Sequence, residues 1–149
     1  MSDQEQPSGE SPEIDDLFFE ESAPVQENRS GKRVLLVDDS EPERLKIGAI
    51  IKQLGGQVFE AADGRQALVK VKQVEPDLIV LDVMMPNRDG LETLKILRQH
   101  QLYRKTPVVM LTVKSDAETV RKALMNQAND YILKDSGPAA IAERLKRYL

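Results

Sequence analysis

The chain reads Val-Leu-Leu-Val-Asp-Asp-Ser over residues 34–40 and Leu-Ile-Val-Leu-Asp over residues 78–82. Two further apolar runs, Val-Val-Met-Leu and Tyr-Ile-Leu, are followed directly by Thr112 and Lys134. Apolar runs of this length are typical of strands in a parallel sheet that is buried on both faces. The carboxyl ends of parallel strands meet at one edge, where the functional crevice of such sheets lies. We therefore predict that the polar residues after these runs form one site.

Helical patterns separate the apolar runs. The first begins at Ser40, which is followed by a proline in the first turn and by Glu43, the arrangement of a capping box. Residues 57–61 are predicted as the second strand, Asp63 as part of the turn after it, and Ser115 as the cap of the fourth helix. The predicted buried faces of the five helices are Ile47, Ile50, Ile51 and Leu54; Ala67, Val71 and Val74; Leu91, Leu94 and Leu97; Val120, Ala123 and Leu124; and Ile141, Leu145 and Leu149. Five strand–helix units predict an α/β protein with a doubly wound, five-stranded parallel sheet.

Charge divides the chain into two parts. Residues 1–31 hold nine acidic residues and one basic residue, a net charge of −8, whereas residues 32–149 hold 20 basic and 16 acidic residues, a net charge of +4. The first part offers too few apolar residues to offset the entropy of ordering, so we predict a disordered acidic tail before one domain. An apolar segment in the tail, beginning at Ile14, is interpreted either as a motif that docks on a partner or as part of an inert leader.

Composition excludes several classes of function. The chain has no cysteine, which excludes disulfides and thiol chemistry, and its single histidine cannot form a histidine cluster. No apolar run approaches the roughly 18 residues that span a bilayer, and no secretory signal is visible. The domain has no run of basic residues, which argues against nucleic-acid binding. We expect a cytoplasmic protein without membrane insertion.

Three carboxylates are predicted to meet at the sheet edge, from Asp38, Asp39 and Asp82. They would repel one another unless a cation neutralised them, and a site of oxygen ligands with high charge suits Mg²⁺. A hydroxyl from Thr112 and an ammonium from Lys134 nearby are suited to binding a phosphoryl group. Asp82 is the candidate nucleophile, because the other two acids are adjacent and better placed as metal ligands. We expect Asp82 alone to face both the metal and Lys134.

These motifs resemble those of the bacterial response-regulator receiver domain, which has the flavodoxin-like (βα)₅ fold. The resemblance covers the chain from Lys32 to Leu149 and is greatest for single-domain receivers that resemble chemotaxis regulators. The segments that carry it are residues 34–40, 82–90, 108–112 and 130–134. It implies that a histidine kinase or a phosphotransfer protein donates a phosphoryl group to the aspartate at position 82, with Mg²⁺ as cofactor.

The resemblance also implies a role for each matching residue. Asp38, Asp39, Asp82 and the backbone carbonyl of Met84 would bind Mg²⁺. Thr112 and Lys134 would contact the phosphoryl group, and Thr112 and Tyr131 would move on activation. A stand-alone receiver of this kind would act through an output protein, which we expect on the face of the fourth and fifth helices. Such a protein would be a signalling domain and not a turnover enzyme.

Two positions depart from the family pattern. Asp135 follows Lys134 where the family usually has a proline in a cis peptide bond, so we expect a trans bond here. Val113 stands where alanine is common in the family, and we expect it to narrow the access of phosphodonors or of an attacking water to the site. Two alternatives stay open: a degenerate receiver that serves as a scaffold, and a Mg²⁺-dependent aspartyl-phosphate phosphatase. Those phosphatases carry an Asp-x-Asp motif at the end of the first strand. Asp82-Val-Met lacks the second acid of this motif.

Overall fold

The computed structural model describes residues 31–149. The predicted disorder of the acidic tail and the apolar segment that begins at Ile14 lie outside the described residues. None of the described helices is long and apolar enough to cross a membrane.

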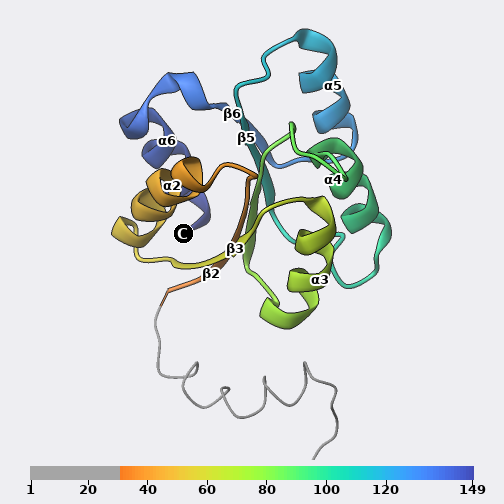
Figure 1. Cartoon of the computed structure of the whole chain (residues 1–149), viewed down its shortest axis with the longest axis horizontal. Helices are drawn as coiled ribbons and strands as arrows, with labels where there is room; N and C mark the ends of the chain where they lie inside the picture. Colours follow the sequence, from red (N-terminus) through yellow and green to blue (C-terminus); the bar gives the residue numbers. More distant parts are fainter. Residues whose placement is uncertain (1–30) are drawn as a thin grey trace, which may run out of the picture. The chain divides into compact units, whose positions relative to one another are not determined.

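Five parallel strands form one sheet, as predicted (Figure 1). Their spatial order is β3-β2-β4-β5-β6, so β4 lies at the centre of the sheet. The second predicted strand is confirmed residue for residue. The strands are β2 (Arg33–Val37), β3 (Gln57–Ala61), β4 (Leu78–Leu81), β5 (Val108–Thr112) and β6 (Asp130–Leu133).

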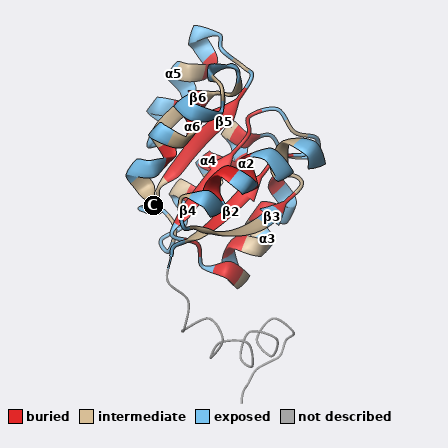
Figure 2. Ribbon diagram, turned by 90° about the vertical axis from the view of Figure 1, so that its left-hand side faces the viewer, coloured by how far each residue is buried: buried red, intermediate tan, exposed pale blue. Residues whose placement is uncertain are grey.

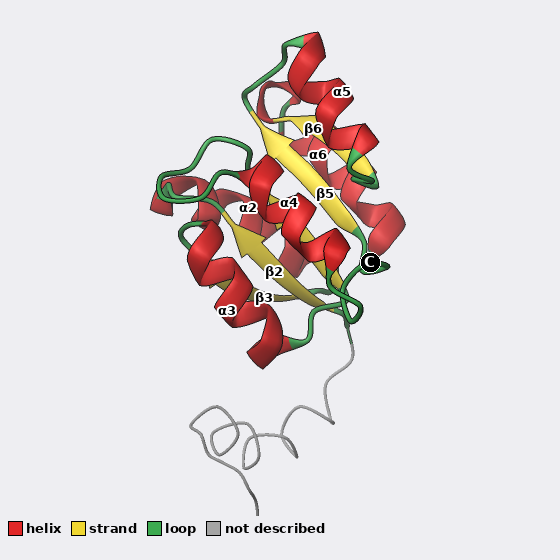
Figure 3. Cartoon of the chain, turned by 90° about the vertical axis from the view of Figure 1, so that its right-hand side faces the viewer, coloured by secondary structure: helices red, strands yellow, loops and turns green. Residues whose placement is uncertain are grey.

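Helices cover both faces of the sheet (Figures 1 and 3). One face packs against α2 (Glu41–Gln53) and α6 (Pro138–Leu145). The other packs against α3 (Gly64–Val74), α4 (Gly90–Gln99) and α5 (Ala117–Met125). Two short 3₁₀ helices complete the described chain, η1 (Lys134–Ser136) and η2 (Lys146–Tyr148).

The strands supply the core because their side chains alternate between the two helical layers. On β2, for example, Val34 and Leu36 face one layer while Leu35 and Val37 face the other, and all four are buried. Burying both faces explains the continuous apolar runs of β2, β4 and β5, whereas the edge strand β3 holds the exposed Glu60. Figure 2 shows the result as a buried sheet between helices whose outer faces are exposed.

Four details of the sequence prediction are wrong. Asp116, not Ser115, caps α5, and Asp63 caps α3 instead of forming only a turn. Helix α6 ends before Leu149, which is partly buried after η2. Leu124 is 52% exposed, because the buried stripe of α5 runs through Thr119 and Ala123, and the next residue lies about 100° further round the helix.

The loop after β4 passes very close to the first turn of α4. A Cβ atom added to Gly90 would lie 2.0 Å from the backbone oxygen of Asp82 and 2.8 Å from the Cα atom of Val83. The Gly90 amide also donates a hydrogen bond to the Val83 carbonyl, 2.8 Å away. Glycine at this position therefore lets α4 begin directly against the end of the central strand, and so helps to fix Asp82.

We predict that Gly90→Ala destabilises the protein by at least about 1–3 kcal/mol, because the clash is with backbone atoms that cannot move aside. Gly48→Ala is the matched control. Gly48 is buried within α2, but its added Cβ would meet only side chains at 3.8 Å and 4.0 Å. This control should be stabilised by roughly 0.5–1 kcal/mol through its higher helix propensity. Denaturant unfolding measures both changes, and equal stability of the two variants would contradict this account.

Candidate phosphorylation site

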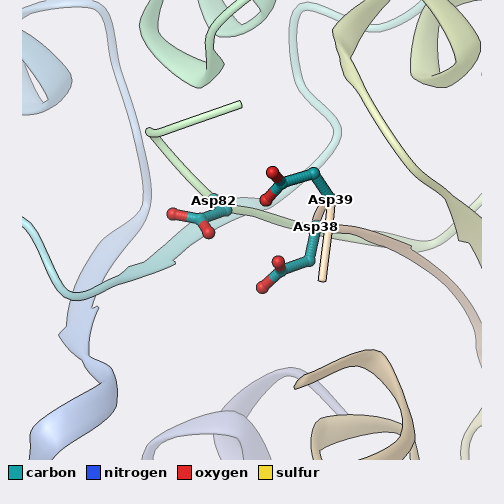
Figure 4. A group of neighbouring side chains, drawn as sticks. All are labelled: Asp38, Asp39 and Asp82. Carbon is teal, nitrogen blue, oxygen red and sulfur yellow. The ribbon is translucent and has the colours of Figure 1, made fainter. Parts of the chain in front are cut away.

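Three carboxylates meet at the carboxyl edge of the sheet (Figure 4). Asp38 and Asp39 follow β2, and Asp82 follows β4, its neighbour in the sheet. One carboxylate oxygen from each lies within 4.8 Å of the others. Asp38 and Asp82 are buried, with 4% and 6% of their surface exposed, whereas Asp39 is exposed. The acidic cluster is therefore compatible with a Mg²⁺ site that keeps one side open to water.

Lys134 joins the buried members of the acidic cluster. Its Nζ atom lies 2.6 Å from Oδ2 of Asp38 and 3.1 Å from Oδ2 of Asp82. The expectation that Asp82 alone faces both the metal site and Lys134 is therefore wrong, because Asp38 also contacts Lys134 and belongs to the acidic cluster. The register of the sheet explains the arrangement, because β6 ends one residue before Lys134 and brings its side chain back over the ends of β2 and β4.

Burial and the contacts at this site shift the pKa values of Lys134 and Asp38. Burial would lower the pKa of Lys134, but its hydrogen bond to Asp38 and the charge of Asp82 together raise that pKa. Burial raises the pKa of Asp38, and the nearby charge of Asp82 adds to the increase, although Lys134 and the Ser40 amide oppose it. Two carboxylates thus favour the charged form of Lys134. The hydrogen bonds to Asp38 offset only part of the effect that burial has on its pKa.

The first turn of α2 contributes contacts that the sequence prediction missed. Oγ of Ser40 accepts a hydrogen bond from the Glu43 amide at 3.3 Å, as a capping box requires. The Ser40 amide, however, donates to Oδ1 of Asp38 at 3.0 Å and not to the Glu43 carboxylate. Nη1 of Arg44 donates to the Asp38 carbonyl at 2.6 Å, and its Nε donates to Glu60 at 2.7 Å. These bonds fix Asp38 and leave the Glu43 carboxylate free to point elsewhere.

Thr112 and Tyr131 lie beside the cluster and bond to the loop between β5 and α5. Thr112 is fully buried, and its hydroxyl accepts a hydrogen bond from the Lys114 amide at 3.2 Å. The hydroxyl of Tyr131 donates to the Lys114 carbonyl at 2.7 Å. Both predicted switch residues therefore contact the backbone of one residue, Lys114, which connects the end of β5 to β6.

Met84 lies at the open side of the site. It lines a pocket of about 490 Å³ together with Asp39, Met85, Asp89 and Lys114, among others. Val113 is 54% exposed, and its predicted effect on access to the site stays a prediction. All peptide bonds within the described residues are trans, as expected for Lys134 and Asp135.

The whole arrangement matches one protein family. A family model for the response regulator receiver domain matches residues 34–146. The chain belongs to this family, whose members are signalling domains of two-component systems that are phosphorylated on aspartate. Its parallel sheet with helices on both faces is the fold that the resemblance implied.

Particular relatives show how receivers are used. The chain is 36% identical over 115 residues to the phosphate regulon transcriptional regulatory protein PhoB of Klebsiella pneumoniae. The matched region makes up 77% of this chain and 50% of the relative. The chemotaxis protein CheY4 of Vibrio cholerae has a similar structure, with a TM-score of 0.74 and 33% identity over 80% of this chain and all of that one. The receiver domain of a sensor histidine kinase from Pseudomonas aeruginosa PAO1, with a magnesium ion coordinated in its active site cleft, gives a TM-score of 0.72 at 28% identity, over 80% and 98% of the two chains.

The chain spans about half the length of the curated PhoB relatives that it matches, and the whole of the CheY4 chain. The relatives therefore include both proteins with further segments and single receivers. The stand-alone arrangement remains a prediction.

The raised pKa of Asp38 leads to a prediction about stability. Because the folded protein holds this proton more tightly than the unfolded chain, ionised Asp38 lowers the free energy of unfolding above its ordinary pKa of 3.8. Without Mg²⁺ at pH 7, Asp38→Asn should therefore have a higher Tm than the wild type.

The pH dependence of this effect supplies its own control. The advantage of Asp38→Asn should disappear as the pH falls towards 3.8, because both proteins then carry a neutral group. Asp39→Asn, which alters the exposed acid next in the chain, should change Tm less. Thermal melts across this pH range measure the difference, and a lower Tm for Asp38→Asn at pH 7 would contradict the assigned sign.

Proposed function

We propose that this receiver accepts a phosphoryl group on Asp82 and transmits the signal through contacts that depend on this phosphorylation. The observation that carries the proposal is the position of Asp82. Its carboxylate is buried at the end of the central strand, shares the Lys134 ammonium with Asp38, and lies within reach of both other acids. A nucleophile and the cationic partner of a phosphoryl group are thus already together.

The hydrogen bonds of the two buried acids favour Asp82 over Asp38 as the nucleophile. Both oxygens of Asp38 are engaged, by the Ser40 amide at 3.0 Å and by Lys134 at 2.6 Å. The bonds to Asp82 are longer, 3.3 Å from the Met84 amide and 3.1 Å from Lys134. Since shorter charge-assisted hydrogen bonds are the stronger ones, an Asp82 oxygen is freed more readily for attack.

The proposed reaction is a phosphoryl transfer from a phosphohistidine of a kinase or phosphotransfer protein. A carboxylate oxygen of Asp82 forms a bond to phosphorus while the phosphorus–nitrogen bond breaks. The electron pair of the broken bond stays on the imidazole nitrogen, which takes up a proton, and the product is an acyl phosphate. Lys134 would stay beside the phosphoryl oxygens, and the Thr112 hydroxyl would approach them from the end of β5.

The acidic cluster fits a magnesium ion. Asp38, Asp39 and Asp82 supply the hard oxygen ligands, and the backbone carbonyl of Met84 would complete the protein's share of the sphere. When bound, Mg²⁺ would neutralise the negative charge that accumulates on phosphoryl oxygens. The carboxylates themselves would hold the ion, and Lys134 would balance the charge that remains.

The output partner is proposed to bind the face formed by α5, β6 and α6. Leu124 and Met125 are 52% and 70% exposed, which gives α5 exposed apolar side chains. The hydrogen bond from Tyr131 of β6 to the Lys114 carbonyl connects the same face to the loop after Thr112. A movement of Thr112 towards a phosphoryl group would therefore be transmitted through the Lys114 backbone to α5 and β6.

We predict that a small phosphodonor with Mg²⁺ labels the wild-type protein once, and that Asp82→Asn abolishes the label while the fold persists. Asp77→Asn is the matched control, because Asp77 precedes β4 and so stands at the opposite end of the same strand. It should be labelled as the wild type is. Intact-protein mass spectrometry measures the label, and full labelling of Asp82→Asn would refute the assignment.

The same assay separates the alternative functions. A stable single label supports the switch, and rapid release of phosphate over many turnovers would support a phosphatase. A wild type that takes no label from either a small phosphodonor or a phosphohistidine protein would support the scaffold. The proposed receiver is labelled and loses its label slowly relative to enzymatic turnover.

A further inference from the structure

An unused hydrogen-bond donor and an unused acceptor face each other beside the site. The Lys134 ammonium has three N–H groups, and two of them donate to Asp38 and Asp82. Oε1 of Glu43 is enclosed by protein and, within residues 31–149, accepts no hydrogen bond. The two atoms are 3.9 Å apart, which is near enough for electrostatic attraction but too far for a hydrogen bond.

The position of the Glu43 carboxylate follows from the way α2 begins. In a complete capping box this carboxylate would accept a hydrogen bond from the Ser40 amide. Asp38 takes that amide instead, at 3.0 Å. Glu43 is therefore directed towards Lys134, and an enclosed carboxylate oxygen without a partner costs stability. This oxygen is therefore available to accept a hydrogen bond if the partners of Lys134 change.

Phosphorylation would change the partners of Lys134. Both present partners of Lys134 belong to the acidic cluster. A carboxylate oxygen of Asp82 becomes part of the acyl phosphate and loses its charge, while Asp38 is required as a ligand for the metal. Lys134 must then turn to the phosphoryl group, and Glu43 is a carboxylate outside the cluster that lies within 4 Å of its Nζ atom.

We propose that Glu43 is a positioning residue for the phosphorylation of Asp82. It accepts the third N–H of Lys134 when the first two partners are altered, and it holds the ammonium against the transferring phosphoryl group. The inference rests on the proposed function and adds to it a residue that acts through Lys134.

The test compares Glu43→Gln and Glu43→Ala with Glu41→Gln. Glu41 lies in the same first turn of α2 but is exposed, so it controls for the loss of a negative charge at a helix N-terminus. The rate of Asp82 labelling is measured against acetyl phosphate concentration at saturating Mg²⁺. The Tm of each variant is measured separately in Mg²⁺-free buffer with a chelator.

We expect opposite effects on rate and stability. Glu43→Ala should lower the maximum labelling rate about tenfold and Glu43→Gln about threefold, because glutamine keeps a neutral acceptor and a charged hydrogen bond is worth more than a neutral one. The acetyl phosphate concentration for half-maximal rate should change less than about twofold, since positioning acts on the transition state. The Tm of Glu43→Gln without metal should exceed that of Glu41→Gln, because the enclosed oxygen then belongs to a neutral amide, whose burial without a hydrogen bond costs less than that of a carboxylate oxygen.

Each other outcome overturns the proposal. Maximum rates within about twofold of the wild type in both Glu43 variants would show that Lys134 needs no further acceptor. An equal loss of rate in Glu41→Gln would assign the effect to general charge, and a Tm for Glu43→Gln below that of Glu41→Gln would assign Glu43 a structural role. A wild type that is not labelled at all would contradict the proposed function itself, and the inference with it.

Discussion

The site depends on one ammonium group placed between two buried carboxylates. Asp38 and Asp82 end adjacent strands, so the parallel sheet itself forces their charges together. Two buried like charges cost free energy that packing elsewhere must offset. Lys134, held at 2.6 Å and 3.1 Å from them, reduces this cost without removing it, as the raised pKa of Asp38 shows. We propose that the remaining negative charge gives the site an affinity for cations and for a phosphoryl group accompanied by a metal.

The rest of the fold can be understood as support for this arrangement. The apolar strands fix the ends of β2, β4 and β6 relative to one another, and Gly90 lets α4 start against the backbone that carries Asp82. On the other side, the start of α2 engages Asp38 through the Ser40 amide and Arg44. The hydrogen bonds of Thr112 and Tyr131 to the Lys114 backbone connect the end of β5 to β6. We propose that a phosphoryl group on Asp82 draws Thr112 towards it and that these bonds carry the movement to the surface.

The fold and the acidic cluster were predictable because they follow from local pattern. Apolar runs identify strands, parallel topology puts their carboxyl ends at one edge, and polar residues at those ends must meet there. The failures have a common cause, since they depend on contacts between segments. The sequence pattern placed Leu124 inside and the cap of α5 at Ser115, because helix rotation and the first helical residue are set by packing. Asp38 accepts the hydrogen bond of the Ser40 amide, which a capping box would give to Glu43. Asp38 also accepts a hydrogen bond from Lys134, which was expected to face Asp82 alone among the acids.

We propose that Lys134 and a bound cation together neutralise the acidic cluster. The most direct test is the rise in Tm on adding Mg²⁺ at millimolar concentration, measured for the wild type and for Lys134→Met. Without the ammonium the acids repel one another more strongly, so the variant should melt lower than the wild type in metal-free buffer and should gain more from Mg²⁺, because tighter binding to the folded state gives a larger stabilisation. A rise in Tm for Lys134→Met that is equal to or smaller than that of the wild type would contradict the account.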